Sequence, residues 1–455
     1  MSLVSTERLH PGGRRRVAGH VGLAIASALA VLLTLAASLT LLPAMLARYG
    51  SRLERRRTRH LPFRPQRAAL APTGADTPAP HRSAWKRWSG TVQARPWPLA
   101  IASLVLMVAL LLPVAGLRLD TSDAGNDPAG SSSRRAFDLL AQGFGSGFNG
   151  PLVLVAQLPE NAPVAALAEL RAATRATPDV VAVTQPQTAP NGRVAVMVAY
   201  PASAPQAPAT TKLVNTLRHE VLSPLERRTG IPVLVGGFTA SSIDFSHLLA
   251  SKLPLFITIV VLLSALLLFV MFRSLVIPIQ AALMNLLTIG AALGATVLVF
   301  QSGWFASVLG VQEGPIEPWI PVITFAVVFG LSMDYEVFLV SRVREEWLRR
   351  GDASAAVADG ITFTGRVITA AAAIMVCVFF SFMLGHLRVI KEFGFGLSVA
   401  VLLDALVVRC VLLPSVLVLL GPNTWRLPRR LAVRLPDVDI EGSAARAVSE
   451  GQLFK

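Results

Sequence analysis

The stretch "FGLSMDYEVFLVSRVREEW", residues 329–347, places an acid and a phenol inside an otherwise apolar run. That run is long enough to cross the ~30 Å hydrocarbon core of a bilayer as a helix of about 20 residues. An ionised aspartate near the centre of such a helix costs about 2.5–3.5 kcal/mol on insertion scales. Asp334 and Tyr335 therefore indicate either a buried hydrogen-bond network or a site that carries protons.

The composition of the whole chain agrees with a membrane location. Of its 455 residues, 53% are hydrophobic and only 15% are charged, and the mean hydropathy is +0.57. Long apolar runs in such a chain are typical of a polytopic α-helical membrane protein. The sequence predicts about seven spans, at roughly 21–46, 97–117, 253–272, 276–301, 319–341, 364–385 and 394–420.

The basic residues follow the membrane segments. The formal net charge is +15, but the arginines cluster beside apolar runs, as membrane topology requires, so we do not expect nucleic-acid binding. Residues 48–96 contain twelve Lys or Arg against two acids, which predicts a cytoplasmic segment. The predicted organisation is 1–20 N-terminal tail, 21–47 first transmembrane helix, 48–96 basic cytoplasmic linker, 97–117 transmembrane helix, 118–252 extracytoplasmic domain, 253–421 five-helix transmembrane bundle and 422–455 cytoplasmic tail.

The extracytoplasmic segment has the sequence of an α+β domain. The runs "GPLVLVAQL", "VVAVTQP", "RVAVMVAY" and "IPVLVGG" are rich in valine and are bounded by turn residues, which predicts four strands. The runs "APVAALAELRAATRA" and "TTKLVNTLRHEVLSPLERRTG" predict two helices. The resulting order, β-α-β-β-α-β, is the split βαβ or ferredoxin-like pattern.

The first and the last predicted spans end in similar sequences. The run "SLTLLPAMLARYG" (38–50) matches "RCVLLPSVLVLLG" (409–421), and in each a glycine follows the proline by seven residues. The match indicates that the first span closes one repeat and that the remaining six spans form another.

Five stretches of the sequence carry a resemblance to a known family: "RLDTSDAGNDPAGSSSRRAFDLLAQGFGSGFNGPLVLV", "FRSLVIPIQAALMNLLTIGAALG", "FGLSMDYEVFLVSRVREEW", "GITFTGRVITAAAAIMV" and "LLDALVVRCVLLPSVLVLLG". With these stretches, six spans and a ferredoxin-like domain between the first and the second resemble one half of an RND-type transporter. The resemblance is closest to the MMPL branch, the lipid exporters of mycobacteria and related actinobacteria. A complete chain of that family has twelve spans, so we expect this chain to be a truncated form that holds the sixth span and the second half.

The resemblance implies a proton-driven exporter of lipid or another hydrophobic solute, located in the cytoplasmic membrane. In MMPL proteins the Asp-Tyr pair of this span meets an equivalent pair on the fourth span, so Asp334 and Tyr335 are the expected proton-relay residues. The chain has no G-x-x-x-x-G-K-[ST] phosphate loop, so we expect an ion gradient as the energy source and no cofactor. The expected partners are membrane lipids and either a separate N-terminal half or a second copy of the chain.

Other charged and polar residues lie inside the predicted spans. Asp404 and Arg409 are five residues apart, about 140° around an α-helix, so we expect a poor direct pair in which each residue contacts a neighbouring helix, in a structural or a coupling role. Ser332 permits close helix approach, and Glu336 is expected to be paired or to extend toward the interface. Arg366 is expected to anchor its helix at the membrane interface.

The histidines and cysteines predict neither a metal site nor a disulfide. His20 and His386 stand at the ends of predicted spans, where no set of metal ligands surrounds them. Cys377 and Cys410 both lie within apolar runs, and we expect them to be small core side chains.

Two other classes of function are compatible with parts of the sequence. An aspartyl intramembrane protease needs two facing carboxyl groups, for which Asp334 and Asp404 are the candidates, but their surrounding motifs differ from those of such enzymes, so no enzymatic activity is expected. A non-transporting fragment, or an assembly or regulatory subunit, would explain why the partner Asp-Tyr pair is missing. Arg14, Arg15 and Arg16 precede a span whose start should lie outside, which favours a truncated gene.

Overall fold

The computed structural model describes residues 84–159 and 164–425, together with helical positions scattered between 29 and 48. The chain divides into two units, 1–79 and 80–455, and residues 84–159 and 164–425 belong to the second. The predicted N-terminal tail, much of the first transmembrane helix, most of the basic linker and most of the C-terminal tail lie outside the described residues.

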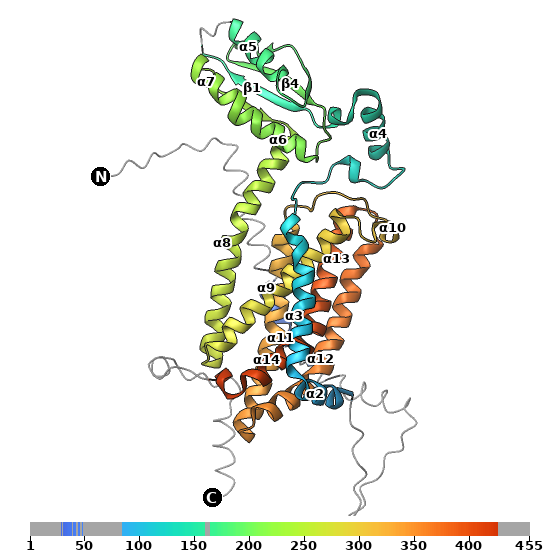
Figure 1. The fold of residues 1–455 in the computed structure, drawn as a ribbon, viewed down its shortest axis with the longest axis vertical. Helices are drawn as coiled ribbons and strands as arrows, with labels where there is room; N and C mark the ends of the chain where they lie inside the picture. The colour runs from blue at the N-terminus through green and yellow to red at the C-terminus, as the bar shows by residue number, and fades with distance from the viewer. Residues whose placement is uncertain are drawn as a thin grey trace, which may run out of the picture. The chain divides into compact units, whose positions relative to one another are not determined.

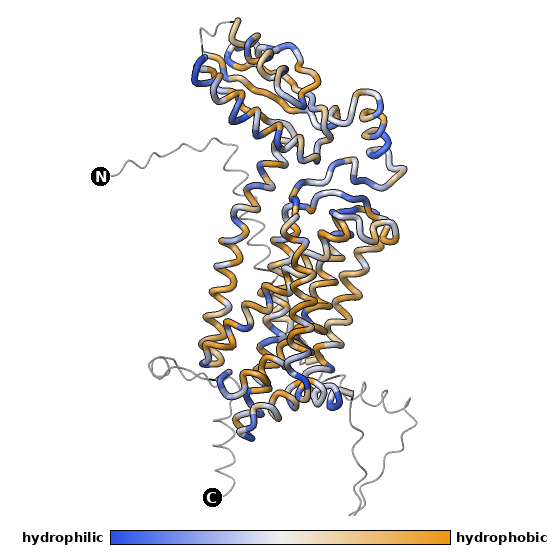
Figure 2. The backbone as a smooth tube through the Cα atoms, in the orientation of Figure 1, coloured by the Kyte–Doolittle hydropathy of each residue, from blue (hydrophilic) through white to orange (hydrophobic). Residues whose placement is uncertain are grey.

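Six helices in the described part of the chain are long and apolar enough to span a membrane (Figure 1; Figure 2). Several of them are continued by 3₁₀ or π-helical segments without a break. The six are α3 with η1 (Pro96–Leu111, Leu112–Gly116), α8 (Phe238–Phe272), α9 with η5 (Val276–Thr296, Val297–Gln301), α11 (Ile320–Arg350), α12 with η6 (Ala353–Ser381, Phe382–Leu384), and α13, η7, α14 and η8 in succession (Arg388–Leu402, Leu403–Leu412, Leu413–Leu420, Gly421–Trp425).

The local sequence "RRGDAS" makes the tight turn between α11 and α12. Gly351 has a φ of +70°, the left-handed conformation that commonly ends a helix and that glycine adopts without a Cβ clash. Asp352 then caps α12, because its side chain accepts two backbone N–H groups of the first turn. The two helices pack closely along their length, since a Cβ on Gly360 would lie only 2.6 Å from Val343.

The central helices of the bundle are α9 and the last helix, α13 to α14. In each, 67% of the positions in the apolar stretch are buried, against 11% in α3 and in α8. Small side chains allow this packing, because a Cβ on Gly294 of α9 would collide with the main-chain carbonyl of Leu110 in α3. Close backbone approach through small residues is typical of membrane helix interfaces. Any polar group on the inner faces of the two central helices is therefore shielded from the surroundings of the bundle.

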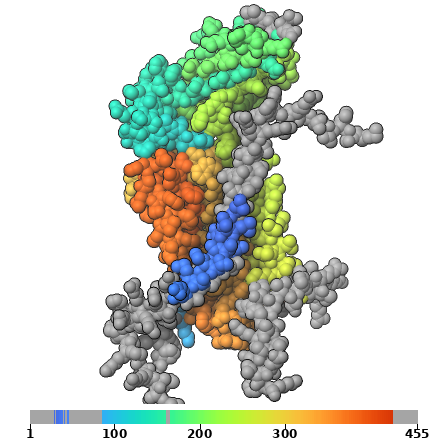
Figure 3. All heavy atoms as spheres, turned by 180° about the vertical axis from the view of Figure 1, so that it is seen from behind, coloured from blue at the N-terminus to red at the C-terminus, as the bar shows by residue number. Residues whose placement is uncertain are grey.

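An α+β domain lies between α3 and α8 in the sequence (Figure 1; Figure 3). Neighbouring strands are antiparallel in the order β2-β4-β1-β5, and the short strand β3 pairs with β4. The elements follow the expected β-α-β-β-α-β order, with β3 as an addition. They are β1 (Leu152–Gln157), α5 (Val164–Arg175), β2 (Val180–Val183), β3 (Gln187–Thr188), β4 (Val194–Pro201), α6, η4 and α7 (Pro208–Thr216, Leu217–Leu222, Ser223–Thr229) and β5 (Val233–Gly236).

One face of the sheet holds the core of this domain. Along β1 and β4 every second residue is buried, which is the period of a strand with one covered face. Leu154 and Met197 are opposite each other in the register of these two strands, and both are buried. Leu170 of α5 and Leu217 of η4 belong to the same core cluster, so the helices cover this face.

Two segments join the α+β domain to the bundle. On the way in, Leu119 forms a parallel bridge with Ile316, which precedes α11. On the way out, α8 begins at Phe238 directly after β5 and Gly237, so the predicted domain boundary at 252 lies inside a continuous helix. Shorter helices complete the described residues: α2 (Ala84–Ala94), η2 (Ala124–Asn126), α4 (Ser132–Phe144), η3 (Ser146–Asn149) and α10 (Ala306–Leu309).

Candidate functional site

Five buried polar side chains meet between α9, α11 and η7. Each has at most 4% of its surface exposed, and apolar core residues surround them. Polar groups without partners are costly in such a place, so their contacts decide what the site can do. We call these residues the central cluster: Asn285 of α9, Ser332 and Glu336 of α11, and Asp404 and Arg409 of η7.

Asp404 and Arg409 form a direct ion pair, with Arg409 Nε 3.4 Å from Asp404 Oδ2. The prediction of a poor direct pair is therefore wrong. It assumed α-helical geometry, whereas Leu403–Leu412 is π-helical. A π-helix bonds residue i to residue i+5, so side chains five apart lie close together along the same face.

Ser332 connects α11 to the other two helices of the central cluster. Its Oγ lies 2.6 Å from Asn285 Oδ1 and 2.8 Å from Asp404 Oδ1, and it accepts a hydrogen bond of 2.6 Å from Arg409 Nη2. Arg409 also donates to the main-chain carbonyl of Ser332. A hydroxyl has a single proton, so Ser332 donates to Asn285 or to Asp404, but not to both at once.

Glu336 completes the cluster as a second carboxylate. Its Oε2 is 3.5 Å from Arg409 Nη1, so the expectation that Glu336 is paired agrees with an ion pair inside the bundle. Arg409 Nη1 makes no hydrogen bond within the described residues, although it is buried. The single guanidinium thus serves two carboxylates, and the cluster carries one uncompensated negative charge when both are ionised.

Asp334 and Tyr335 lie outside the central cluster, although they follow Ser332 by only two and three residues. The side chain of Asp334 is exposed, and it makes no ion pair or hydrogen bond with the described residues. Tyr335 is half-buried, and its Oη lies 3.7 Å from Met375 Sδ on α12. The acid therefore faces away from the chain's own polar network, whereas Tyr335 packs against a neighbouring helix.

The exposed face of α11 around Asp334 is apolar and contains small residues. Ala326, Gly330, Asp334 and Phe338 are all exposed, and each follows the one before it by four residues. Residues four apart lie on the same side of an α-helix. A Cβ on Gly330 would meet no atom within 4 Å, so open space lies beside the acid.

Other predicted positions do not join the central cluster. Arg366 is exposed on α12, and its side chain makes no ion pair or hydrogen bond among residues 84–159 and 164–425. The structure also does not bring Asp334 and Asp404 together, because the first is exposed and the second is buried against Arg409. The paired carboxyl groups that an aspartyl protease needs are therefore not formed by these two residues.

The two cysteines differ in environment. Cys410 is buried in η7, as expected, whereas Cys377 is exposed on α12. The expectation of a core position for Cys377 is therefore wrong, because an apolar run does not tell which side of a membrane helix packs on its neighbours. In the described part of the chain, no three His, Cys, Asp or Glu side chains are grouped to hold a metal ion.

A second buried arginine lies at the start of the last helix. Arg388, at the start of α13, is only 4% exposed and forms an ion pair of 3.2 Å with Glu392 one turn later. Glu392 accepts a hydrogen bond from the backbone N–H of Glu317, whose own carboxylate accepts from the backbone N–H of Ser122. We call Arg388, Glu392, Glu317 and Ser122 the outer cluster. It ties α13 to the segment that leads into the α+β domain.

Main-chain carbonyls supply most of the acceptors for Arg388. Its guanidinium donates to the carbonyl oxygens of Gln312, Gly314 and Pro315 at 2.9–3.0 Å, and to that of Phe300 at 3.3 Å. In the sequence, Arg388 lies in the short stretch between the predicted spans 364–385 and 394–420. The structure shows that its side chain is buried and holds segments of the protein together.

Two acids in the segment before the α+β domain have altered titration. Burial raises the pKa of Asp120, although hydrogen bonds from Ser242 Oγ and the Thr121 N–H oppose the rise. Burial also raises the pKa of Asp123, and the nearby Asp120 carboxylate adds to that rise. Both groups lie outside the membrane helices, between η1 and α4.

Sequence reasoning missed Asn285, Arg388, Glu392 and the contact made by Glu317. Asn285 offered a usable signal, since it is an isolated amide in the middle of a predicted span. Arg388 and Glu392 also have the spacing of a helical i,i+4 pair next to a span. Their common role was not visible because the acceptors come from segments about 70 to 270 residues away in the sequence.

Comparison with known proteins gives a consistent result. The model of the "MMPL family" matches residues 127–436. Membrane protein YdfJ of Bacillus subtilis is 35% identical over 92% of this chain and 55% of its own length. The mycolic acid-containing lipids exporter MmpL11 of Mycolicibacterium smegmatis is 32% identical over 92% of this chain and 43% of its own length. The trehalose monomycolate exporter MmpL3 of Mycobacterium tuberculosis is 36% identical over 81% of this chain and 40% of its own length.

The chain spans about half the length, or less, of these curated relatives. The matched region includes α9, α11 and the last helix, and therefore all five residues of the central cluster. Several apolar helices agree with the membrane location of such proteins. The chain is thus a multi-pass membrane protein that belongs to the MMPL family.

Proposed function

We propose that this chain forms the second half of a proton-driven MMPL-type exporter, which moves lipid or another hydrophobic solute across the cytoplasmic membrane. The observation that carries the proposal is the exposed carboxylate of Asp334 on an apolar face of α11. Hydrocarbon is a costly environment for an ionised acid, so this face requires a polar partner. The proposed partner is the equivalent Asp-Tyr pair of a first half, with Asp334 and Tyr335 as the relay residues on this side.

Binding of a proton changes the contacts within the central cluster. Asp404 and Glu336 share the guanidinium of Arg409, so one proton removes the uncompensated charge of the cluster. A proton passed inward from Asp334 changes which acceptor the Ser332 hydroxyl uses and how Arg409 divides between the two carboxylates. One charge moved across 100 mV releases about 2.3 kcal/mol. That exceeds the ~0.5–1.5 kcal/mol of a typical hydrogen bond, so a single proton suffices for such a rearrangement.

The α+β domain is proposed to act as a porter-type domain that shapes the exit path. Its strand order, β2-β4-β1-β5, agrees with a ferredoxin-like sheet once the short β3 is set aside. It is joined to the bundle through Leu119 and through the unbroken α8, so a change in the helices reaches it directly. The solute class follows from the relatives, two of which are named as exporters of mycolic acid-containing lipids and of trehalose monomycolate.

The test is proton flux in membrane vesicles that contain this chain together with the first half of a full-length MMPL relative. We expect Asp334→Asn to lower proton flux by about 100-fold or more, the scale of a lost proton-transfer group. Arg366→Gln is the matched control, because it also removes an exposed charge from a span but leaves the proposed relay intact. Unchanged flux in Asp334→Asn would remove Asp334 from the mechanism.

A second candidate is an assembly or regulatory subunit that binds a first half without carrying protons. The apolar, glycine-containing face around Asp334 favours such an association as well. Gly330→Trp fits the space beside the isolated chain but would obstruct a helix packed on that face. Loss of association in Gly330→Trp, combined with normal flux in Asp334→Asn, would support the subunit over the transporter.

A further inference from the structure

The short helix α2 packs onto the bundle with one face. Trp85, Trp88, Ser89 and Val92 recur at the i, i+3, i+4, i+7 spacing of a single helix face, and Ser89 and Val92 are buried. Trp85 lies on Gly365 of α12, where a Cβ would come within 2.6 Å of the indole ring. The docked face of α2 therefore depends on close contact with the membrane helices.

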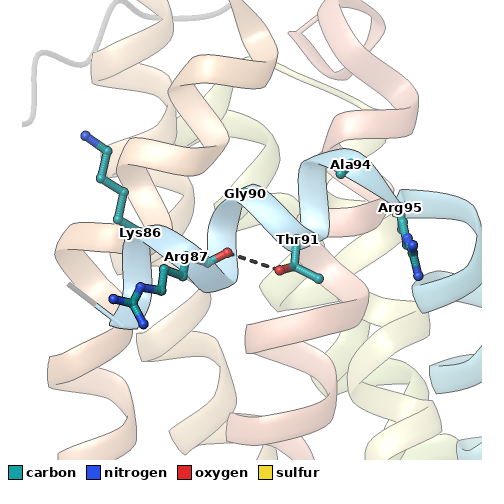
Figure 4. A pocket seen from close by; sticks show the side chains of 6 residues that line it. All are labelled: Lys86, Arg87, Gly90, Thr91, Ala94 and Arg95. Carbon is teal, nitrogen blue, oxygen red and sulfur yellow. Dashed lines mark hydrogen bonds between the residues drawn. The ribbon is translucent and has the colours of Figure 1, made fainter. Parts of the chain in front are cut away.

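The opposite face of α2 is polar and open. Figure 4 shows Lys86, Arg87 and Arg95 extending from the helix there, with the Thr91 hydroxyl bonded to the carbonyl of Arg87. A helix with this division of faces is suited to the boundary between bundle and solvent. It also stands at the end of the basic segment that the sequence predicts to be cytoplasmic.

Trp88 makes a contact that packing alone does not require. Its indole Nε1 donates a 2.8 Å hydrogen bond to the main-chain carbonyl of Cys410 in η7. In an α-helix that carbonyl would accept from the N–H four residues later, but residue 414 is proline and has none. The indole N–H thus takes the place of the backbone N–H that residue 414 lacks because it is proline.

The carbonyl held by Trp88 belongs to the residue that directly follows Arg409. The π-helical segment around it is what brings Arg409 within 3.4 Å of Asp404. π-helical turns are rare and depend on local support for the altered hydrogen bonds. Here the cap of η7 shows the altered pattern, because the N–H of Leu413 donates to the carbonyl of Val408, five residues earlier.

We propose that Trp88 is a positioning residue, which holds the π-helical segment in the register that sets Arg409 between Asp404 and Glu336. By this contact α2 acts on the central cluster, and so regulates the proton step. The regulatory part rests on the proposed transport function, whereas the positioning part concerns the geometry of this chain alone. The two parts are tested by separate measurements.

The positioning part is tested by the reactivity of the Cys410 thiol in the full chain, with Cys377→Ser to remove the exposed thiol. Trp88→Phe keeps the ring but loses the N–H, and we expect labelling of Cys410 to accelerate by about 2- to 10-fold, the factor produced by one lost hydrogen bond. Trp85→Phe is the matched control on the same docked face and should leave the rate unchanged. Equal rates in the two variants would overturn the proposal.

A second variant separates lost hydrogen bonding from altered packing. Pro414→Ala returns an N–H to the position that an α-helix would use for the Cys410 carbonyl. We expect Pro414→Ala to slow the labelling of Cys410 in the Trp88→Phe background, because the carbonyl regains a donor. Persistent fast labelling would show that Trp88 acts only as a packing side chain, which would overturn the positioning role.

The regulatory part is tested by the pH dependence of proton flux in the vesicles with a first half. We expect the pH midpoint to shift in Trp88→Phe and to stay constant in Trp85→Phe, since only the first variant changes the register of Arg409. Faster Cys410 labelling without a shifted midpoint would overturn the regulatory role. If the unsubstituted chain carries no flux, the proposed transport function fails, while the labelling comparison still decides the positioning role.

Discussion

Two buried arginines on one helix differ in the groups that accept their hydrogen bonds. Arg388 of the outer cluster donates mainly to main-chain carbonyls, together with Glu392 and Ser122. Arg409 of the central cluster contacts the side chains of Asp404, Glu336 and Ser332. Carbonyl oxygens do not change their protonation, whereas carboxylates do. The helix is therefore fixed at its outer end and adjustable in its middle.

Because of this difference, the start and the middle of the last helix have separate roles. The outer cluster holds the start of α13 against the segment that enters the α+β domain, through Ser122 and Glu317. The central cluster contacts α11 next to the exposed Asp334. A rearrangement at Arg409 thus acts on a helix whose far end is anchored to the domain. Variants that disturb one arginine at a time test whether this division is real.

The largest expected effect is on the fixed arginine. Arg388→Met leaves Glu392 buried without its ion-pair partner and leaves several carbonyls without a donor, which should cost about 3–5 kcal/mol of stability. Arg409→Met should cost less, because Arg409 donates to only one main-chain carbonyl, that of Ser332, whereas Arg388 donates to four. The measurement is thermal unfolding of the detergent-solubilised chain. An equal or larger loss in Arg409→Met would contradict the distinction between a fixed and an adjustable arginine.

A smaller effect is expected at the hydroxyl that links the three helices. Ser332→Ala removes the acceptor of Arg409 Nη2 and the donor to Asn285 or Asp404, which should cost about 1–3 kcal/mol in a buried site. Ser398→Ala is the control, since that hydroxyl is also buried but bonds only to the carbonyl of Gly394 on its own helix. Urea or thermal unfolding of both variants measures the difference. If the two losses are the same, Ser332 is not a link between helices.

The membrane helices and the elements of the α+β domain were accessible to sequence reasoning because both signals are local. Long apolar runs reveal spans, although the predicted limits at 341 and 364 missed the helical residues that continue α11 and begin α12. The order of strands and helices between α3 and α8 likewise follows from runs of valine bounded by turns. None of these features depends on contacts between distant segments.

The geometry of the site was less accessible, for physical reasons. A π-helix and an α-helix are built from the same kinds of apolar residues, so the hydrophobic pattern did not reveal that 403–412 is π-helical. Without that geometry, a direct Asp404–Arg409 pair was not expected. The side of α11 that packs inward depends on α9 and the last helix, so the sequence did not predict that Ser332 is buried and Asp334 exposed. Arg388 lies between two predicted spans, and nothing near it in the sequence indicates its acceptors, which come from segments far along the chain.

The smallest expected effect lies in the segment that the outer cluster anchors. Because the pKa of Asp120 is raised by burial, the folded chain binds more protons than the unfolded chain in the interval just above the ordinary value of 3.8. Stability contributed by protonated Asp120 is therefore fully present below that value and is lost as the pH rises through the higher folded-state pKa. Asp120→Asn removes this dependence and keeps an oxygen that can accept from Ser242 and Thr121.

We therefore expect the unfolding temperature of the unsubstituted chain to fall slightly more than that of Asp120→Asn when the pH is raised from about 4 toward neutrality. Asp138→Asn is the control, because Asp138 is an exposed partner of Arg134 on α4. Parallel pH curves for Asp120→Asn and the unsubstituted chain would show that Asp120 does not titrate differently on folding. Asp123, whose pKa is also raised by burial, would then be the next carboxyl group of this segment to replace, by Asp123→Asn, in the same pH series.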